Sequence, residues 1–218
     1  MKGAAEPPSA SSPDEPPSAS SGPRRGPWTT LAVRRVYDNP WIEVAEHDVI
    51  DPSGRPGLYG VVSPRNLAIG VLPIFSDGTT ILVGQYRYAI DRYSWEMPEG
   101  GGPKDVAPQV SAVRELAEET GLEASGWAEL QRIDLSNSVT DELAVSFLAW
   151  DLHSLAGGAT LESTEGDLVS DRVPFASVVA RVLAGEITDS MTVAMVLLVE
   201  LLRTRGGLPA PVAAALRH

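Results

Sequence analysis

Residues 100–122 join a run of glycines to a highly charged segment, and no other stretch limits the possible folds as strongly. The segment reads GGGPKDVAPQVSAVRELAEETGL. We predict a loop over residues 100–102 and a helix over about 107–120, because Asp105 can cap the start of the helix and Gly121 can end it. Apolar residues are expected to anchor this helix on a core, and these are Val110, Val113, Leu116 and Ala117.

The charged residues of this segment share one face of the predicted helix. Glu115, Glu118 and Glu119 lie at positions i, i+3 and i+4, and Arg114 lies one turn before Glu118 and can pair with it. Acidic runs on helices are usually solvated surfaces, and that interpretation stays open here. The glycine run favours a site instead, because it lets backbone carbonyls approach a ligand. Carboxylates together with a carbonyl form the hard oxygen donor set that suits Mg²⁺ or Mn²⁺.

Composition disfavours several kinds of function. The net charge of −12 would repel nucleic-acid phosphates, so we expect no nucleic-acid partner, although a cation could still hold a small phosphorylated ligand. The chain has no cysteine, which excludes disulfides, thiolate zinc sites and cysteine nucleophiles. The apolar run after residue 190 is about a dozen residues long, too short for a membrane span, and the first residues lack the apolar run of a secretory signal. We therefore expect a cytoplasmic protein with no membrane partner.

The chain is expected to consist of a tail over residues 1–27 and one domain over residues 28–218. The tail is rich in Pro and Ser and contains EPPSASS twice, so we predict disorder there. Alternating apolar and polar residues between turn signals predict strands within 28–51, 57–63, 66–75, 79–88, 126–135, 142–152 and 167–175. Helices are expected over 174–185 and 191–205, the second capped by Asp189 or Ser190. This order of elements predicts an α+β or layered α/β/α domain.

The charged segment resembles the signature of the Nudix hydrolases, G-x5-E-x7-R-E-U-x-E-E-x-G-U. The matching residues are Gly100, Arg114, Glu115, Leu116, Glu118, Glu119, Gly121 and Leu122. Val106 stands where the signature has a glutamate. We interpret Val106 as the loss of an outer residue of the site, because we place it in the first turn of the helix, about three turns before Glu119.

The resemblance extends over about residues 34–203 and is closest to the ADP-ribose pyrophosphatase branch of that family. It is carried by Gln85-Tyr86-Arg87, Trp95-Glu96-Met97-Pro98-Glu99-Gly100, Thr140-Asp141-Glu142 and Gly185-Glu186-Ile187-Thr188-Asp189. The resemblance implies an α/β/α sandwich with a mixed sheet, and a homodimer to which the amino-terminal strands of residues 28–66 contribute. It also implies Mg²⁺-dependent cleavage of ADP-ribose to AMP and ribose 5-phosphate, or of a nucleotide sugar such as GDP-mannose.

Carried onto this sequence, the resemblance assigns roles around the acidic face. Glu115 and Glu119 would be metal ligands, joined by Glu118, directly or through water, and by the backbone carbonyl of Glu99. Arg114 would orient the glutamates. The general base would come from the later acidic loop, where the candidates are Glu162, Glu165 and Asp167, and we favour Glu165.

Four residues are candidates for binding the substrate: Arg87, Glu96, Glu142 and Trp41. An arginine could grip a phosphate through two hydrogen bonds, but it could equally form a surface salt bridge. Glu96 could bind a base or a ribose hydroxyl, or cap the end of a strand. Trp41, like Trp95, could stack on a nucleobase or belong to the core.

Two alternatives to an enzyme stay open. The missing glutamate at position 106 would suit a Nudix-fold module that binds ADP-ribose without cleaving it, whereas the retained Glu115, Glu118 and Glu119 argue against such a sensor. We also expect no appended DNA-binding helical domain after residue 218. A purely structural domain would leave the glycine run and the acidic face unexplained together.

Overall fold

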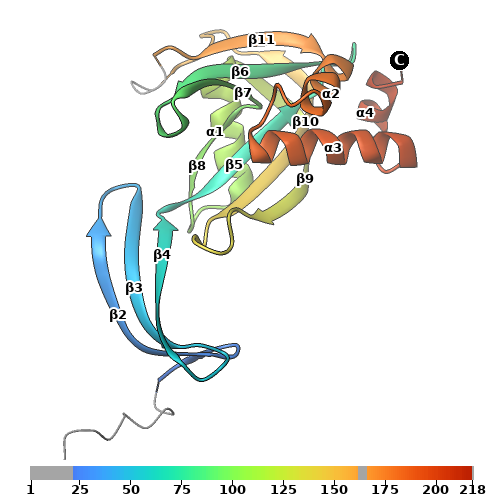
Figure 1. Cartoon of the computed structure of the whole chain (residues 1–218). Coiled ribbons are helices and arrows are strands. Elements are labelled where there is room, and N and C mark those ends of the chain that lie inside the picture. Colours follow the sequence, from blue (N-terminus) through green and yellow to red (C-terminus); the bar gives the residue numbers. More distant parts are fainter. Residues whose placement is uncertain (1–21, 162–165, 218) are drawn as a thin grey trace, which may run out of the picture. The chain divides into compact units, whose positions relative to one another are not determined.

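The computed structural model describes residues 22–161 and 166–217, and its chain divides into two compact units (Figure 1). The first unit holds Val44–Val61 and the described residues up to Tyr37, and the second holds Asp38–Glu43 and the described residues from Val62 onward. Over both described ranges, no helix combines the length and apolar character needed to cross a membrane.

The first unit is built on a sheet with the strand order β1-β2-β3-β4. These strands are β1 (Arg24–Arg25), β2 (Trp28–Asp38), β3 (Ile42–Ile50) and β4 (Pro56–Pro64). A turn joins β3 to β4, in which the Asp51 carboxylate accepts hydrogen bonds from the amides of Ser53 and Arg55 at 2.8 and 2.9 Å. Strand β1 lies within the predicted tail, whose residues 1–21 fall outside the described part of the chain.

The central sheet of the second unit is mixed, as the family resemblance implies. Its order is β8-β5-β10-β9, with β5 (Asn66–Pro73), β8 (Glu99–Pro103), β9 (Leu122–Asp134) and β10 (Leu143–Ser154). Strand β10 runs parallel to β5, while β8 and β9 pair antiparallel with β5 and β10. A second sheet has the order β11-β6-β7, with β6 (Thr79–Arg87), β7 (Arg92–Glu96) and β11 (Val169–Pro174), and the 3₁₀ turn η1 (Tyr88–Ile90) links β6 to β7.

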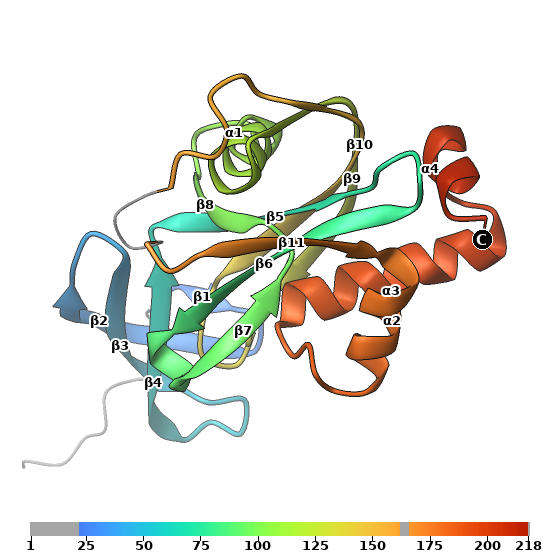
Figure 2. The same ribbon diagram turned by 90° about the horizontal axis from the view of Figure 1, so that it is seen from above.

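Helices cover both faces of the central sheet, which confirms the α/β/α sandwich. The helices are α1 (Pro108–Thr120), α2 (Phe175–Leu183), α3 (Ser190–Arg205) and α4 (Ala210–Ala215). Alternate side chains of β5 point in opposite directions. Ile69 therefore packs in one cluster with Leu116 of α1, and Leu72 packs in the other with Met195 of α3. Figure 2 shows α1 and α3 on opposite sides of β5.

The glycine run is strand β8 and not the loop predicted from the sequence. It pairs with β5 from Glu99 to Pro103. A Cβ at Gly102 would lie 2.8 Å from both Ile69 Cγ1 and Ser111 Oγ. The absence of side chains therefore lets this strand lie directly beneath α1, and pairing with β5 outweighs the weak strand preference of glycine. Strand β7 and helix α4 were also not predicted from the sequence.

The start of α1 also differs from the prediction. The helix begins at Pro108 with Ala107 as its N-cap, and no side chain caps it, so Asp105 does not serve as the cap. Val106 consequently lies in the preceding turn, where its amide donates to the Pro103 carbonyl at 3.1 Å. At the other end, Gly121 terminates the helix with φ of 67°, as expected. The cap of α3 is confirmed as well, because Asp189 Oδ2 accepts the Thr192 amide at 2.7 Å.

Replacing Gly121 with alanine should destabilise the second unit more than the same change at Gly185. Both glycines have left-handed backbones, with φ of 67° and 72°, which cost an alanine about 1–2 kcal/mol. A Cβ at Gly121 would in addition lie 2.7 Å from the backbone of Gly158 and Ala159, whereas nothing lies within 4 Å at Gly185. Urea unfolding of Gly121→Ala and Gly185→Ala measures the difference, and equal losses would contradict the close backbone packing at Gly121.

Candidate active site

Helix α1 turns two of its glutamates into the protein rather than toward solvent. Glu115 is 4% exposed and Glu119 is 2% exposed, so the solvated acidic face is excluded for these two. The predicted packing is wrong for Val110 and Val113, which are 60% and 43% exposed. Leu116, in contrast, is buried as predicted. The inward side of α1 therefore carries carboxylates beside its apolar contacts.

Arg114 holds the side chains of Glu115 and Glu118 in place. Its Nη2 donates to the Gly101 carbonyl at 2.7 Å and to Glu115 Oε1, and its Nη1 donates to Glu118 Oε2. One guanidinium thus joins strand β8 to two glutamates of α1. Charge-assisted bonds of this kind fix the orientation of both partners.

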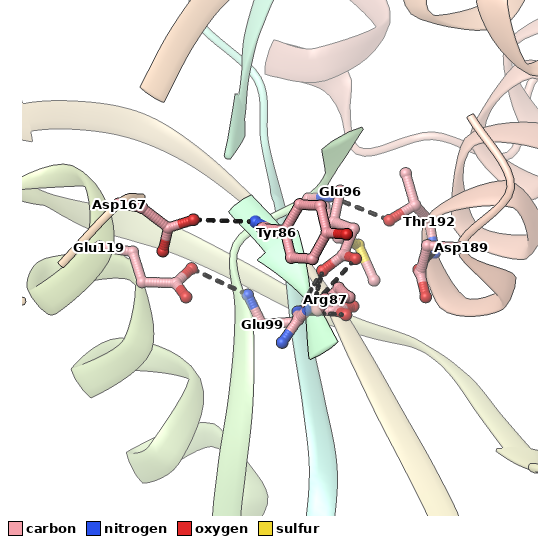
Figure 3. Close-up of polar contacts among 9 residues, drawn as sticks. Tyr86, Arg87, Glu96, Glu99, Glu119, Asp167, Asp189 and Thr192 are labelled. Atoms are coloured by element: carbon pink, nitrogen blue, oxygen red, sulfur yellow. Dashed lines mark hydrogen bonds and ion pairs between the residues drawn. The ribbon is translucent and has the colours of Figure 1, made fainter. Parts of the chain in front are cut away.

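Strand β8 brings its backbone against the same carboxylates. The Glu99 amide donates to Glu119 Oε2 at 3.0 Å (Figure 3). A Cβ at Gly100 would lie 2.4–2.5 Å from the Glu115 carboxylate, so only glycine lets the strand come this close. The backbone at residue 99 and the carboxylates of Glu115 and Glu119 therefore lie together, as the predicted ligand set requires.

A second charged group lies between the end of β6 and the turn that joins β7 to β8. Arg87 Nε donates to both oxygens of Glu96 at 3.0 and 3.1 Å, Nη2 also bonds Glu96, and Nη2 lies 3.4 Å from Glu99 Oε1 (Figure 3). Burial by itself would raise the pKa of the Glu96 carboxyl, but the hydrogen bonds and charge of Arg87 outweigh it and lower that pKa. The Glu96 side chain is therefore a buried carboxylate held by a guanidinium.

The Glu99 side chain lies within this second group, and few hydrogen bonds offset the burial of its carboxyl. Its Oε2 is buried, and it accepts no hydrogen bond from any residue in the described ranges. Burial, followed by the nearby carboxylates of Asp189 and Glu96, raises the pKa of Glu99 well above its usual value. Carboxylate oxygens of Glu96, Glu99 and Asp189 lie within 4.8 Å of one another.

The residues of both groups fit a divalent cation. They offer oxygen donors, which Mg²⁺ and Mn²⁺ prefer, and one of these donors is the buried Glu99 oxygen that no described residue bonds. Arg87 and Arg114 form ion pairs within these groups, yet negative charge remains in excess even with Glu99 protonated. The carboxylates concerned are those of Glu96, Glu99, Glu115, Glu118 and Glu119.

Two of the predicted substrate-binding residues, Trp41 and Glu142, belong to neither of these two charged groups. Trp41 is 71% exposed, which excludes the core interpretation, whereas Trp95 packs against the apolar core. Glu142 precedes β10, where burial and the neighbouring Asp141 raise its pKa and Lys104 opposes the rise. The structure thus places Arg87 with Glu96, whereas Glu142 lies just before β10, within electrostatic range of Lys104.

The candidate base is only partly covered by the structure. Glu162 and Glu165 lie outside the described residues. Asp167 is described, and its Oδ2 accepts the Tyr86 amide at 3.0 Å (Figure 3).

Asp189 and Thr192 also lie in this region, although neither was predicted to be a site residue. Thr192 is fully buried, and its hydroxyl oxygen accepts the Met97 amide at 2.9 Å. The Gly185-Glu186-Ile187-Thr188-Asp189 stretch was the available signal, because it ends at the start of α3.

Two protein-family profiles together match most of the described chain. The "Nucleoside diphosphate sugar hydrolase N-terminal domain" profile matches residues 28–62, and the "NUDIX domain" profile matches residues 64–178. An "ADP-ribose pyrophosphatase" of Mycobacterium tuberculosis is 35% identical over 147 residues, covering 66% of this chain and 70% of that protein. The "ADP-ribose pyrophosphatase" of Bacillus subtilis is 30% identical over 136 residues, covering 62% and 73%. The fold is similar to the crystal structure of an "ADP compounds hydrolase", with a TM-score of 0.72, 22% identity and coverage of 83% of this chain and 97% of that one.

Replacing Arg114 with alanine should destabilise the metal-free protein by about 1–3 kcal/mol, because buried Glu115 and the Gly101 carbonyl lose a donor. Arg132→Ala is the matched control, since Arg132 pairs with Glu129 on the exposed surface and its loss should cost much less than the loss of Arg114. Urea unfolding in the presence of a chelator measures both. Equal effects would show that Arg114 does not organise the acidic group.

Proposed function

We propose that this chain, which belongs to the Nudix hydrolase family, hydrolyses the diphosphate linkage of ADP-ribose to give AMP and ribose 5-phosphate. The observation that carries the proposal is the hydrogen bond from the Glu99 amide to Glu119, which sets a strand backbone beside the buried carboxylates of α1. The names of the relatives support ADP-ribose as the substrate. A nucleotide sugar such as GDP-mannose is the nearest rival substrate. The match of residues 28–62 to a nucleoside diphosphate sugar hydrolase profile supports this rival.

We propose Mg²⁺ as the cofactor, with Mn²⁺ as a substitute. Glu115, Glu119 and the Glu99 carbonyl would hold it, with Glu118 as a further ligand. Such an ion, when bound, neutralises the diphosphate and lowers the pKa of an attacking water. An acidic protein can hold a polyanionic substrate in this way.

The protein's own side chains would divide the remaining work. Arg114 holds Glu115 and Glu118 in a fixed orientation. Arg87 is 36% exposed at its side chain and can offer its outer N–H groups to a phosphate while Nε stays on Glu96. Glu142 and exposed Trp41 are proposed to contact the rest of the substrate, Trp41 by stacking on the base.

The bond changes follow from these roles. A water oxygen attacks one phosphorus of the diphosphate, the bond from that phosphorus to the bridging oxygen breaks, and the bridging oxygen leaves with the other phosphate. A carboxylate takes the proton of the water, and we propose Glu165 for this step, with Asp167 as its nearest described alternative.

We further propose that a second copy of the chain packs against the strands of residues 28–66. Large apolar side chains are exposed there, and they are Leu31, Val33, Val36, Tyr37 and Leu58. Such a density of exposed apolar residues is typical of an interaction surface.

One observation favours a second candidate function. Val106 replaces a glutamate of the signature, which would suit a module that binds ADP-ribose without turnover. Its position in the turn before α1, outside the helix that carries the carboxylates, argues that this replacement is peripheral.

In Mg²⁺, the protein should hydrolyse ADP-ribose to AMP and ribose 5-phosphate faster than it hydrolyses GDP-mannose or a dinucleotide. Glu119→Gln should lower kcat by several orders of magnitude, because the amide can still accept the Glu99 N–H but no longer carries charge. Glu123→Gln, an exposed change on β9, is the control and should leave kcat unchanged. Tight binding without turnover at any pH would overturn the enzyme proposal, and a mild Glu119→Gln effect would overturn the metal placement.

Replacing Val106 with glutamate should change kcat/KM by less than about tenfold, because residue 106 lies outside the buried acidic group. The measurement is steady-state hydrolysis of ADP-ribose by both proteins. An inactive wild-type chain that Val106→Glu restores would instead establish the binding module.

A further inference from the structure

The turn between β7 and β8 is fixed by backbone hydrogen bonds to three different elements. The Met97 amide donates to Thr192 Oγ1 of α3 at 2.9 Å. The Pro98 carbonyl accepts the Val71 amide of β5 at 2.8 Å. The Glu99 amide donates to Glu119 of α1 at 3.0 Å. Consecutive residues are thus tied to a helix on each side of the sheet and to the sheet itself.

Thr192 is held in place for this contact. It lies in the first turn of α3, is fully buried, and donates its own amide to the cap residue Asp189 at 2.7 Å. A Cβ at Gly70 would lie 2.2 Å from Met97 Cε and 3.0 Å from Met191 Cε. The start of α3 and the turn at Met97 therefore pack together over a glycine of β5, which leaves the hydroxyl little freedom to move.

The position of Thr192 matters because Glu96, just before Met97, and Glu99, two residues after it, belong to the candidate site. Glu96 holds Arg87, and Glu99 supplies both the amide bonded to Glu119 and the carbonyl proposed as a metal ligand. Met97 is itself fully buried, so its amide has no water to replace a lost acceptor. A shift of this turn would move Glu96 and the Glu99 carbonyl together, away from the carboxylates of α1.

We propose that Thr192 is a positioning residue for this active site, acting from α3, beyond residues 64–178 matched by the Nudix profile. Its hydroxyl oxygen accepts the Met97 amide and so sets the Glu99 carbonyl against Glu115 and Glu119. The proposal rests on the proposed function in one respect, the use of the Glu99 carbonyl as a metal ligand. Partners that orient metal ligands commonly affect metal affinity or activity by about 10–100-fold.

The test replaces Thr192 with valine, which keeps the shape but loses the acceptor, and with serine, which keeps the hydroxyl. Mn²⁺ affinity is measured by titration without substrate, and hydrogen exchange of the Met97 amide is measured in the metal-free protein. Thr192→Val should weaken Mn²⁺ binding about tenfold or more, speed Met97 exchange and lower kcat about 10–100-fold, with KM within about threefold. Thr192→Ser should keep the Mn²⁺ affinity, the Met97 exchange rate, kcat and KM close to those of the wild type. Thr204→Val, an exposed change in the same helix where the hydroxyl bonds the Leu201 carbonyl at 2.8 Å, should leave them unchanged.

Unchanged Mn²⁺ affinity and kcat in a folded Thr192→Val protein would overturn the proposal, as would a serine variant as impaired as the valine variant. If Thr192→Val does not fold, Thr192→Ala removes the same acceptor and is judged by the same values. A wild-type chain that binds Mn²⁺ but leaves every tested substrate intact would refute the proposed function, and the Mn²⁺ affinities would still decide the role of Thr192.

Discussion

The Glu99 amide donates to the Glu119 carboxylate, and this one contact joins the turn after β7, strand β8 and helix α1. Glycine at position 100 makes the contact possible, since any side chain there would occupy the space of the Glu115 carboxylate. Arg114 then closes the arrangement from the other end by bonding the Gly101 carbonyl together with Glu115 and Glu118. The close approach of β8 to α1 and the burial of the glutamates are therefore consequences of a single packing arrangement.

Burying so many carboxylates is costly unless each is hydrogen-bonded or paired with a cation. Arg87 meets this requirement for Glu96, and Arg114 meets it for Glu115. Glu99 meets it only in part, and its raised pKa reflects that deficit. Such a group of acids is stable when one member is protonated or a cation is bound, which links the electrostatics of the site to the proposed metal dependence.

Much of the fold could be predicted from local patterns. Strands β5, β6 and β10, helix α3 with its Asp189 cap, and the end of α1 at Gly121 follow from alternation, capping and glycine conformation, and the structure confirms them. The glycine run was predicted wrongly because strand preference describes single residues, whereas β8 is stabilised by pairing with β5 and by the space beneath α1. Val110 and Val113 were predicted wrongly because a helix normally buries valine before glutamate.

The sequence by itself determined the residue types of the site and their helical spacing, because positions i and i+4 share a helix face in any fold. It also determined where α1 and α3 end, since the left-handed backbone of Gly121 and Gly206 requires little more than the absence of a Cβ. Only the tertiary structure decided which glutamates are buried, that Arg87 pairs with Glu96, and that Thr192 holds Met97. Residues 97 and 192 are far apart along the chain, and a hydrogen bond between them depends on how α3 packs on the sheet, which no local pattern specifies.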